Sequence, residues 1–351
     1  MDKAIVFTHN LLAKNFAKTC HGLLRGTERF EIISVIDAAH EGKDAGTVLN
    51  GSPLGIPVHS SIAQFFKHSN ESPEFCIVGV AFPGGVLPED CRKELLAAMD
   101  HGLSIVCGLH HYLSEDPEFQ ISAKNNGVKL IDIRKPRPIS ELHFWTGEIL
   151  QITVPVIAIL GSDCAVGKRT TARFIMEACR NRGIKTEMIY TGQTGWMQGY
   201  SHGFIFDATP NDFVSGEIER VVLECVNVSK PDLILLEGQS SLRNPSGPCG
   251  SEFLLSGNAK GVVLIHPPGR KHFVDMEELG FQIPDIEDEI GLIQKYGSKV
   301  IGVGLNEEGC DMSQLRSAQR TITKKMNIPV VLPLTDGVNE IVDGIQTFMN
   351  K

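Results

Sequence analysis

Short apolar runs alternate with longer segments of helical periodicity from one end of the chain to the other. In the first part, the runs that predict buried strands are residues 4–8, 31–37, 75–80, 103–107 and 128–133. Between them, residues 88–102 show the clearest helical pattern, which Pro88 begins and Gly102 ends. Strands that alternate with helices in this way predict a parallel sheet covered by helices on both faces.

The second part repeats the pattern more strongly. Its expected strands are residues 154–160, 186–191, 232–237, 261–266, 299–306 and 329–334. Its expected helices are residues 170–182, 212–228, 286–296, 313–326 and 338–349. The pattern predicts a doubly wound domain of six or seven strands, a fold that binds ligands at the carboxyl ends of its strands.

Residues 134–151 interrupt this alternation. They contain Pro136 and Pro138 together with several charges, which is typical of a linker. We therefore expect two α/β domains, one over residues 1–145 and the other over residues 146–351.

The composition argues against several classes of protein. The chain has 351 residues, a net charge of −9 and no dense basic run, so it is a poor candidate for binding nucleic acid. Its nine cysteines form no C-x-x-C pair, and we expect them to be reduced and largely buried rather than zinc-binding. We see no signal peptide and no apolar stretch near the ~20 residues of a membrane span, and we expect a cytoplasmic protein without a membrane partner.

The clearest chemical motif is a loop between an apolar strand and a helix. It consists of Gly161, Ser162, Asp163, Cys164, Ala165, Val166, Gly167 and Lys168, and Arg169 and Thr170 follow it. In such a loop, backbone N–H groups and the helix N-terminus bind phosphates, and the lysine reaches the terminal phosphates. We expect the Lys168 side chain to face solvent when no ligand is bound. The motif predicts a P-loop that binds a polyphosphate-bearing ligand.

This loop departs from the G-x-x-x-x-G-K-[ST] pattern at two positions. Gly161 comes one residue early, so that Ser162 stands where the first glycine is usual. Arg169 replaces the Ser or Thr that holds Mg²⁺, and Thr170 comes one place late for that role. A guanidinium at this position suits a diphosphate that protein cations neutralise, such as that of coenzyme A.

Charged side chains follow several other expected strands. Glu237 ends one strand, where a P-loop domain usually places a metal ligand or a base, although a solvent-facing glutamate is the alternative. His266 ends another, as a candidate base or as part of a solvated loop. Arg243 and Arg270 are candidates for bidentate binding of a substrate carboxylate.

Two further positions in the second part are candidate ligand contacts. Gln193 and Thr194 lie in a glycine-bounded segment after the strand at 186–191, where they either contact substrate or form a simple turn. Asn306 ends the strand at 299–306, where many P-loop proteins read a purine base.

In the first part the candidate residues point to no familiar site. Asp37 ends the second strand, but the first strand leads to no G-x-G-x-x-G, which argues against a dinucleotide site. His110 and His111 have no third ligand placed by spacing, so we expect no metal.

Several segments together resemble the DgcN family, long catalogued as a domain of unknown function. They are Gly-Ser-Asp-Cys-Ala-Val-Gly-Lys (161–168), Tyr-Thr-Gly-Gln-Thr-Gly (190–195), Leu-Glu-Gly-Gln-Ser-Ser-Leu (236–242), Gly-Leu-His (108–110), and residues 17–25 and 81–89. The resemblance implies a Rossmann-like N-terminal domain followed by a P-loop domain. It also implies D-glutamate N-acetylation in D-glutamate breakdown, with acetyl-CoA as donor. The phosphate loop is similar to that of dethiobiotin synthetases too, which use ATP and Mg²⁺ and carry Thr where this chain has Arg169.

These expectations combine into one hypothesis for the reaction. The loop amides, Lys168 and Arg169 bind the phosphates of the coenzyme, and one of the two arginines named above binds a substrate carboxylate. Glu237 or His266 removes a proton from the substrate ammonium, because only the free amine attacks the thioester. Backbone donors near residues 192–195 stabilise the oxyanion.

Two other functions fit the same residues. An ATP-dependent ligase or kinase would hold Mg²⁺ through Asp163, Thr170 or Glu237. A non-catalytic regulator would bind a nucleotide in the second domain and sense a metabolite through the first. In the catalytic readings the partner is a small molecule, and we expect a symmetric homo-oligomer, as is common for large doubly wound enzymes.

Overall fold

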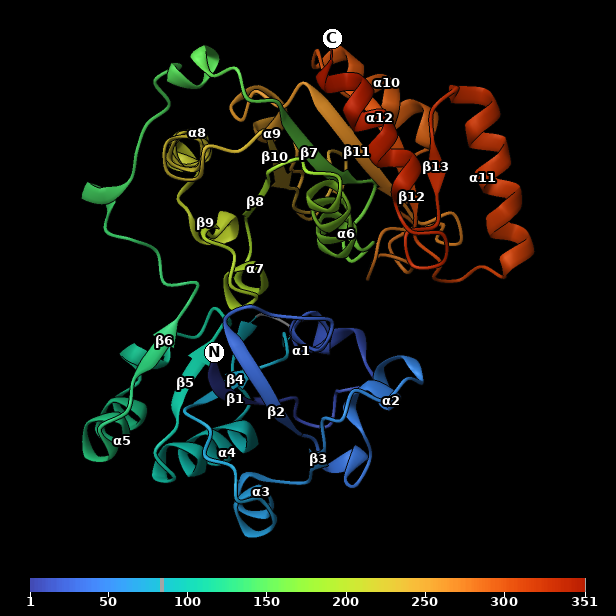
Figure 1. The fold of residues 1–351 in the computed structure, drawn as a ribbon. Coiled ribbons are helices and arrows are strands. Elements are labelled where there is room, and N and C mark those ends of the chain that lie inside the picture. Colours follow the sequence, from blue (N-terminus) through green and yellow to red (C-terminus); the bar gives the residue numbers. More distant parts are fainter. Residues whose placement is uncertain (83–84, 351) are drawn as a thin grey trace. The chain divides into compact units, whose positions relative to one another are not determined.

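A computed structural model of the chain describes residues 1–82 and 85–350 (Figure 1). The first of its two compact units comprises Met1–Arg137 and Gly192–Ser201, and the second comprises Pro138–Thr191 and His202–Lys351. The division falls inside the expected linker, at Pro138 rather than near residue 145. Residues 83 and 84 of the family-like segment 81–89 lie outside the described residues.

The first unit is built on a six-stranded parallel sheet in the order β3-β2-β1-β4-β5-β6. Its strands are β1 (Asp2–Phe7), β2 (Phe30–Ile36), β3 (Val58–His59), β4 (Phe75–Val78), β5 (Ser104–Cys107) and β6 (Leu130–Asp132). Its helices are α1 (Lys18–Leu24), α2 (Ala45–Asn50), α3 (Ile62–His68), α4 (Glu89–Asp100), α5 (Pro117–Asn126) and α7 (Gln193–Met197). The winding direction reverses between β1 and β4, which is the Rossmann-like arrangement.

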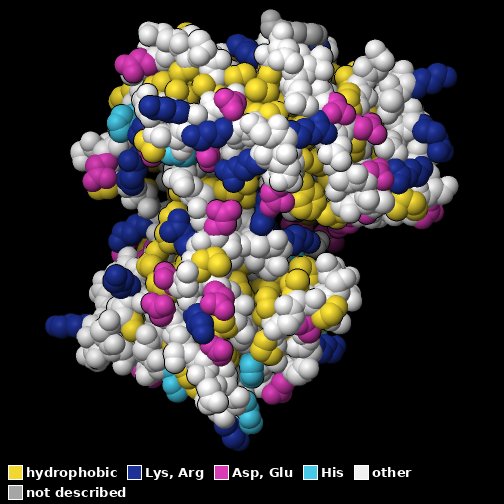
Figure 2. All heavy atoms as spheres, viewed as in Figure 1, with side chains coloured by type: hydrophobic (Ala, Val, Ile, Leu, Met, Phe, Trp, Pro, Cys, Tyr) yellow, Lys and Arg dark blue, Asp and Glu magenta, His cyan; other side chains and the backbone are white. Residues whose placement is uncertain are grey.

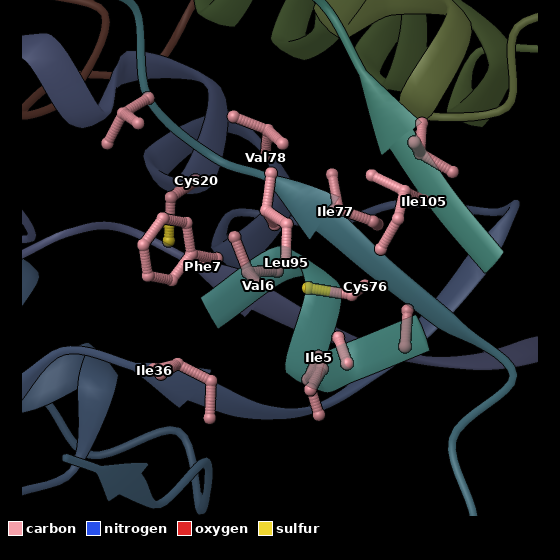
Figure 3. Close-up of a cluster of buried hydrophobic side chains, with 14 of the residues drawn as sticks. Ile5, Val6, Phe7, Cys20, Ile36, Cys76, Ile77, Val78, Leu95 and Ile105 are labelled. Carbon is pink, nitrogen blue, oxygen red and sulfur yellow. The ribbon is translucent and has the colours of Figure 1, made fainter. Parts of the chain in front are cut away.

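The core of the first unit lies around its two central strands. Figure 3 shows Val6 of β1 and Ile77 of β4 together with Leu95 of α4, and all three side chains are fully buried. Cys76 lies in the same cluster, where burial raises the pKa of its thiol to about 12. The thiol therefore stays protonated and packs as a small apolar group, as expected from the sequence.

The second unit is built on a seven-stranded parallel sheet in the order β13-β12-β11-β7-β10-β8-β9. Its strands are β7 (Val156–Gly161), β8 (Thr186–Tyr190), β9 (His202–Gly203), β10 (Leu233–Glu237), β11 (Gly261–His266), β12 (Lys299–Leu305) and β13 (Val330–Val331). Its helices are α6 (Lys168–Asn181), α8 (Asn211–Ser229), α9 (Ser251–Leu255), α10 (Ile286–Lys295), α11 (Met312–Met326) and α12 (Asn339–Met349). The sheet confirms the doubly wound fold and places the ends of β7, β10 and β11 side by side.

Helix α7 is the main surprise of the fold. Its residues follow β8 of the second unit in sequence, yet they belong to the first unit. The Arg29 side chain fixes the helix, because its Nε donates to the carbonyl of Trp196 at 2.8 Å while its guanidinium lies 4.1 Å from the centre of the indole. Gly22 permits α1 to lie close to α7, since a Cβ at this position would come within 2.8 Å of the Thr194 methyl group.

The segment that follows the domain boundary is tied to α8 by two buried glutamates. Glu219 accepts hydrogen bonds from the Thr146 amide and hydroxyl and from the Ile149 amide. Burial alone would raise the pKa of Glu219, but these bonds to the carboxylate lower it below its usual value. Glu217 accepts from the His143 amide at 3.1 Å. Residues 143–149 are therefore an ordered part of the second unit and not a free linker.

Charged side chains of both signs lie on the visible face of the molecule (Figure 2). Figure 2 shows acidic and basic side chains interspersed over the visible face, in line with the net charge of −9. Within residues 1–82 and 85–350, no helix is both long and apolar enough to cross a membrane.

Replacing Gly216 with Ala tests how closely α8 and the boundary segment approach. A Cβ at Gly216 would lie 1.9 Å from the His143 carbonyl oxygen, so the backbone of the segment has to move. We expect Gly216→Ala to lower the free energy of unfolding of the second unit by about 1–3 kcal/mol, measured with urea and Trp145 fluorescence in a Trp196→Phe background. In the matched helical control Gly291→Ala, a Cβ meets nothing within 4 Å, and we expect no loss. Equal effects of the two substitutions would contradict this account.

Candidate functional site

The phosphate loop joins β7 to α6, as its sequence predicted. Gly161 is the last residue of β7 and Lys168 is the first residue of α6. Gly167 has φ of +95°, a left-handed conformation that favours glycine. A Cβ at Gly161 would lie 2.8 Å from a Val166 methyl group and 3.1 Å from Lys168 Nζ. The early glycine thus makes room for the loop to fold back over the end of its own strand.

Lys168 does not face solvent, which corrects our expectation. Its side chain is buried, and Nζ donates to the carbonyl oxygens of Asp163 at 2.8 Å and Ser240 at 2.7 Å. Burial lowers the pKa of this ammonium below its ordinary value. The two carbonyls hold the lysine inside the loop, so a phosphate has to replace them as its partners.

Asp163 organises the loop with its fully buried carboxylate. Oδ2 accepts from Arg270 Nη1 at 2.7 Å and from the Val274 amide at 2.9 Å, and Oδ1 accepts from Asn244 Nδ2 at 3.1 Å. Arg270 also donates to Glu308 at 2.7 Å. Asp163 and Glu308 therefore both pair with Arg270. The arginine stabilises the loop and is not available to bind a substrate carboxylate.

Arg169 and Glu237 form an ion pair at the ends of the neighbouring elements α6 and β10. Arg169 Nε lies 2.8 Å from Glu237 Oε1, and the carboxylate is only 2% exposed. The second oxygen of Glu237 accepts from the Thr191 amide at 3.3 Å. The N–H of Arg169 Nε is not aligned on the carboxylate and has no hydrogen-bond partner. A guanidinium thus contacts the carboxylate that in many P-loop proteins helps to hold Mg²⁺, and it keeps an unused donor.

His266 contacts the other side of the loop. Its Nδ1 lies 2.9 Å from the hydroxyl of Ser162, which is itself buried. Burial lowers the pKa of His266 to about 4, against the opposing influence of Glu287 and Asp285. The imidazole is therefore neutral at pH 7, and the Ser162 hydroxyl can act as the donor or the acceptor in the bond to Nδ1.

Three further residues border the loop. Asn306 Nδ2 donates to the Val166 carbonyl at 3.1 Å, so this side chain supports the loop instead of pointing to a base. The Cys164 thiol donates to Ser240 Oγ at 3.4 Å. Ser240 has φ of +36°, which is uncommon for serine and turns its carbonyl toward Lys168. Thr170 lies partly exposed in the first turn of α6.

The remaining candidates lie elsewhere in the fold. Arg243 Nε donates to the buried Glu289 at 2.7 Å, which leaves Nη2 without a hydrogen-bond partner. Gln193 and Thr194 are buried within the first unit, where the Thr194 hydroxyl lies 3.2 Å from that of Thr19. Packing inside that unit explains both side chains.

The candidates in the first unit are structural as well. Asp37 accepts from the Thr8 hydroxyl at 2.7 Å and from the Leu12 amide at 2.9 Å. His111 lies 3.2 Å from Asp116. Sequence reasoning missed the contacts of Ser240 and Asn244 with the loop, because no spacing rule connects these two residues with a loop far away in the chain.

Comparisons with known proteins agree with both halves of the fold. Residues 143–342 match a model described as "Domain of unknown function (DUF1611_C) P-loop domain", and residues 38–136 match one described as "Domain of unknown function (DUF1611_N) Rossmann-like domain". A crystal structure of a DUF1611 family protein from Anabaena variabilis ATCC 29413 is 24% identical, covers 99% of this chain and 100% of its own, and superposes with a TM-score of 0.90.

Two curated relatives carry a functional name. Proteins of Tritonibacter scottomollicae and of a Pseudoalteromonas species, both named D-glutamate N-acetyltransferase, are 26% and 28% identical to this chain over 276 residues. In each case the match covers 77% of this chain and 80% of the relative.

The buried imidazole predicts a loss of stability in acid. Between pH 6.5 and about 4, His266 takes up a proton in the unfolded chain but not in the folded one. The free energy of unfolding therefore falls as the pH falls through this range, by up to about 3 kcal/mol. We expect His266→Gln, whose amide can still bond to Ser162, to lose less stability between pH 7 and pH 4 than the wild type in urea titrations. His68→Gln, on an exposed residue, is the control, and parallel pH profiles of wild type and His266→Gln would contradict the prediction.

Proposed function

Because the chain belongs to the DUF1611 family, we propose that it transfers the acetyl group of acetyl-CoA to the amino group of D-glutamate in the breakdown of D-amino acids. The relatives named D-glutamate N-acetyltransferase support the reaction. The observation that carries the choice of donor is the Arg169–Glu237 pair. It puts a permanent cation beside the P-loop at a position where ATP-dependent enzymes place the hydroxyl that binds Mg²⁺.

Coenzyme A offers a diphosphate that fits such a loop. The loop amides and the N-terminus of α6 supply hydrogen bonds and positive potential. Lys168 and Arg169 supply two cations, and the Arg169 Nε–H is free to bond a phosphate oxygen. A diphosphate bound here is neutralised by the protein and needs no metal ion.

The length of the coenzyme restricts where the acetyl group reacts. The arm between the diphosphate and the thioester is as long as roughly four to five extended residues, or about 15 Å. Glu237 and His266 both contact residues of the phosphate loop or the turn that follows it. With the diphosphate in the loop and the arm extended, neither side chain reaches the thioester.

We therefore revise the roles proposed for these two residues. Glu237 orients Arg169, and His266 orients Ser162 at the start of the loop, so both act at the phosphate end of the donor. In the reaction itself, the substrate amine forms a C–N bond with the acetyl carbon, the C–S bond breaks, and CoA leaves as the thiolate. The amine loses one proton, to a base that lies farther from the loop than Glu237 and His266.

A turnover assay with both donors tests the proposal. The full chain with acetyl-CoA and D-glutamate should release free CoA thiol and form N-acetyl-D-glutamate, identified by mass, with L-glutamate as the comparison acceptor. Lys168→Ala should abolish binding of acetyl-CoA, whereas the exposed-lysine control Lys185→Ala should bind as the wild type does. ATP consumption without acetyl-CoA would support a ligase or kinase instead. Tight binding without turnover of either donor would support a regulator.

Substitution of Arg169 tests the metal-free binding of the diphosphate. We expect Arg169→Ala to weaken acetyl-CoA binding by about 1.5–3 kcal/mol, the range for hydrogen bonds to charged groups, measured by calorimetry. Added Mg²⁺ should leave the Kd of the wild type unchanged. Glu237→Gln should raise KM for acetyl-CoA with kcat changed only a few-fold, because Glu237 orients Arg169 and is not the base.

Arg169→Thr is the matched variant, since it restores the usual metal-binding hydroxyl and should increase affinity for Mg-ATP. A neutral Arg169→Ala together with Mg²⁺-dependent binding in the wild type would contradict the proposed role of Arg169. A fall in kcat of Glu237→Gln by ~10²–10⁴ at unchanged KM would restore Glu237 as the base.

A further inference from the structure

Three side chains of the first unit bring together the ligand atoms of a metal site. His9, Asp90 and Cys91 each offer one ligand atom, namely an imidazole nitrogen, a carboxylate oxygen and a thiol sulfur. These atoms all lie within 4.8 Å of one another. This cluster has no part in the proposed acetyl transfer, and the spacing rules that led us to expect no metal do not detect ligands from separate elements.

The cluster lies where α/β sheets bind their ligands. His9 follows β1, while Asp90 and Cys91 lie in the first turn of α4, which follows β4 (Figure 1). β1 and β4 are the neighbouring strands between which the winding direction reverses. The crevice at the carboxyl ends of such a strand pair is the usual binding position in open parallel sheets.

The backbone and two aromatic rings hold His9 in this place. His9 and Asn10 both have left-handed conformations, with φ of +48° and +63°. The turn is fixed by the bond from the Leu11 amide to the Thr8 carbonyl at 2.9 Å. The imidazole also contacts the rings of Phe7 and Phe82, at centroid distances of 6.0 and 5.8 Å. The ring is thereby directed toward α4.

The distance between the ligand atoms of His9 and Asp90 agrees with tetrahedral coordination. Metal–ligand bonds of about 2.0–2.1 Å to nitrogen and oxygen place two ligand atoms of a tetrahedron about 3.3–3.4 Å apart. His9 Nε2 lies 3.3 Å from Asp90 Oδ2. The other carboxylate oxygen, Oδ1, accepts a hydrogen bond from the Cys91 amide at 3.1 Å. This bond orients Asp90 and leaves Oδ2 for a metal. Carboxylate and thiolate together balance the charge of a divalent ion.

We propose that His9, Asp90 and Cys91 bind a divalent transition-metal ion of the zinc type. Nitrogen, oxygen and sulfur ligands in combination select such an ion over Mg²⁺ or Ca²⁺. On binding, the Cys91 thiol loses its proton to solvent and the thiolate sulfur bonds to the metal. Three protein ligands leave the fourth position of the tetrahedron to water or to an anionic ligand such as a carboxylate.

Titration of the tag-free full chain with Co²⁺ tests the site, because cobalt reports its ligands in the absorption spectrum. After removal of bound metal by chelation and desalting, we expect tetrahedral d–d bands and a thiolate-to-cobalt charge-transfer band that saturate at one equivalent. Zn²⁺ should abolish both bands by displacement. Cys91→Ser should remove the charge-transfer band. The absence of that band in the wild type would overturn the proposal.

Two further variants distinguish a loss of metal binding from a loss of the fold. Asp90 is 70% exposed, so Asp90→Asn should fold normally and weaken Co²⁺ binding roughly 10–100-fold or more. Cys310 is a partly exposed cysteine of the second unit, and Cys310→Ser should keep the full spectrum. A charge-transfer band that persists in Cys91→Ser, or that disappears in Cys310→Ser, would assign the metal to other thiols and refute the site. Unchanged affinity in Asp90→Asn would refute it as well.

Discussion

The proposed choice of ligand for the second unit depends on the contact between the Arg169 guanidinium and the buried Glu237 carboxylate. A carboxylate at the end of β10 with almost no exposure has to be paired, because an isolated buried charge is costly. In most P-loop proteins a hydrated metal ion pairs with that carboxylate, and the ion binds together with the nucleotide. Here the partner is a side chain of the chain itself. The positive charge is therefore permanent, and in the proposed function it binds phosphate without a metal ion.

Other buried charges in and beside the phosphate loop also have partners within the chain. Lys168 is held by two carbonyl oxygens, and Asp163 is paired with Arg270. The buried charges of the loop thus have partners within the chain, and in the proposed function a ligand replaces some of these partners. Bound phosphate would improve the interactions of Lys168 and Arg169 most. The first has a depressed pKa that an anion would raise, and the second has an N–H with no hydrogen-bond partner.

The sequence predicted local chemistry better than long-range pairing. The strand–loop–helix arrangement of residues 156–181 and the buried cysteines followed from periodicity and glycine positions. Short elements such as α7 and β9 escaped prediction, because a few residues carry no measurable period. The orientation of Lys168 and the pairing of Arg270 were missed for a different reason. Both depend on partners contributed by distant turns, Ser240 for the lysine and Asp163 for the arginine, and no local pattern encodes which carbonyl or carboxylate a long cationic side chain will reach.

Glu237 contacts the chain at the point where it passes from the second unit to the first. Thr191, whose amide bonds to Glu237, is the last residue before the chain leaves the second unit, and Gly192 already belongs to the first. The five residues of α7 are anchored there by Arg29 and Thr19. The residue that contacts Glu237 is therefore bonded directly to a residue of the first unit. The first unit, with its proposed metal site at the carboxyl ends of β1 and β4, is thus continuous in sequence, through Gly192, with a residue that contacts Glu237.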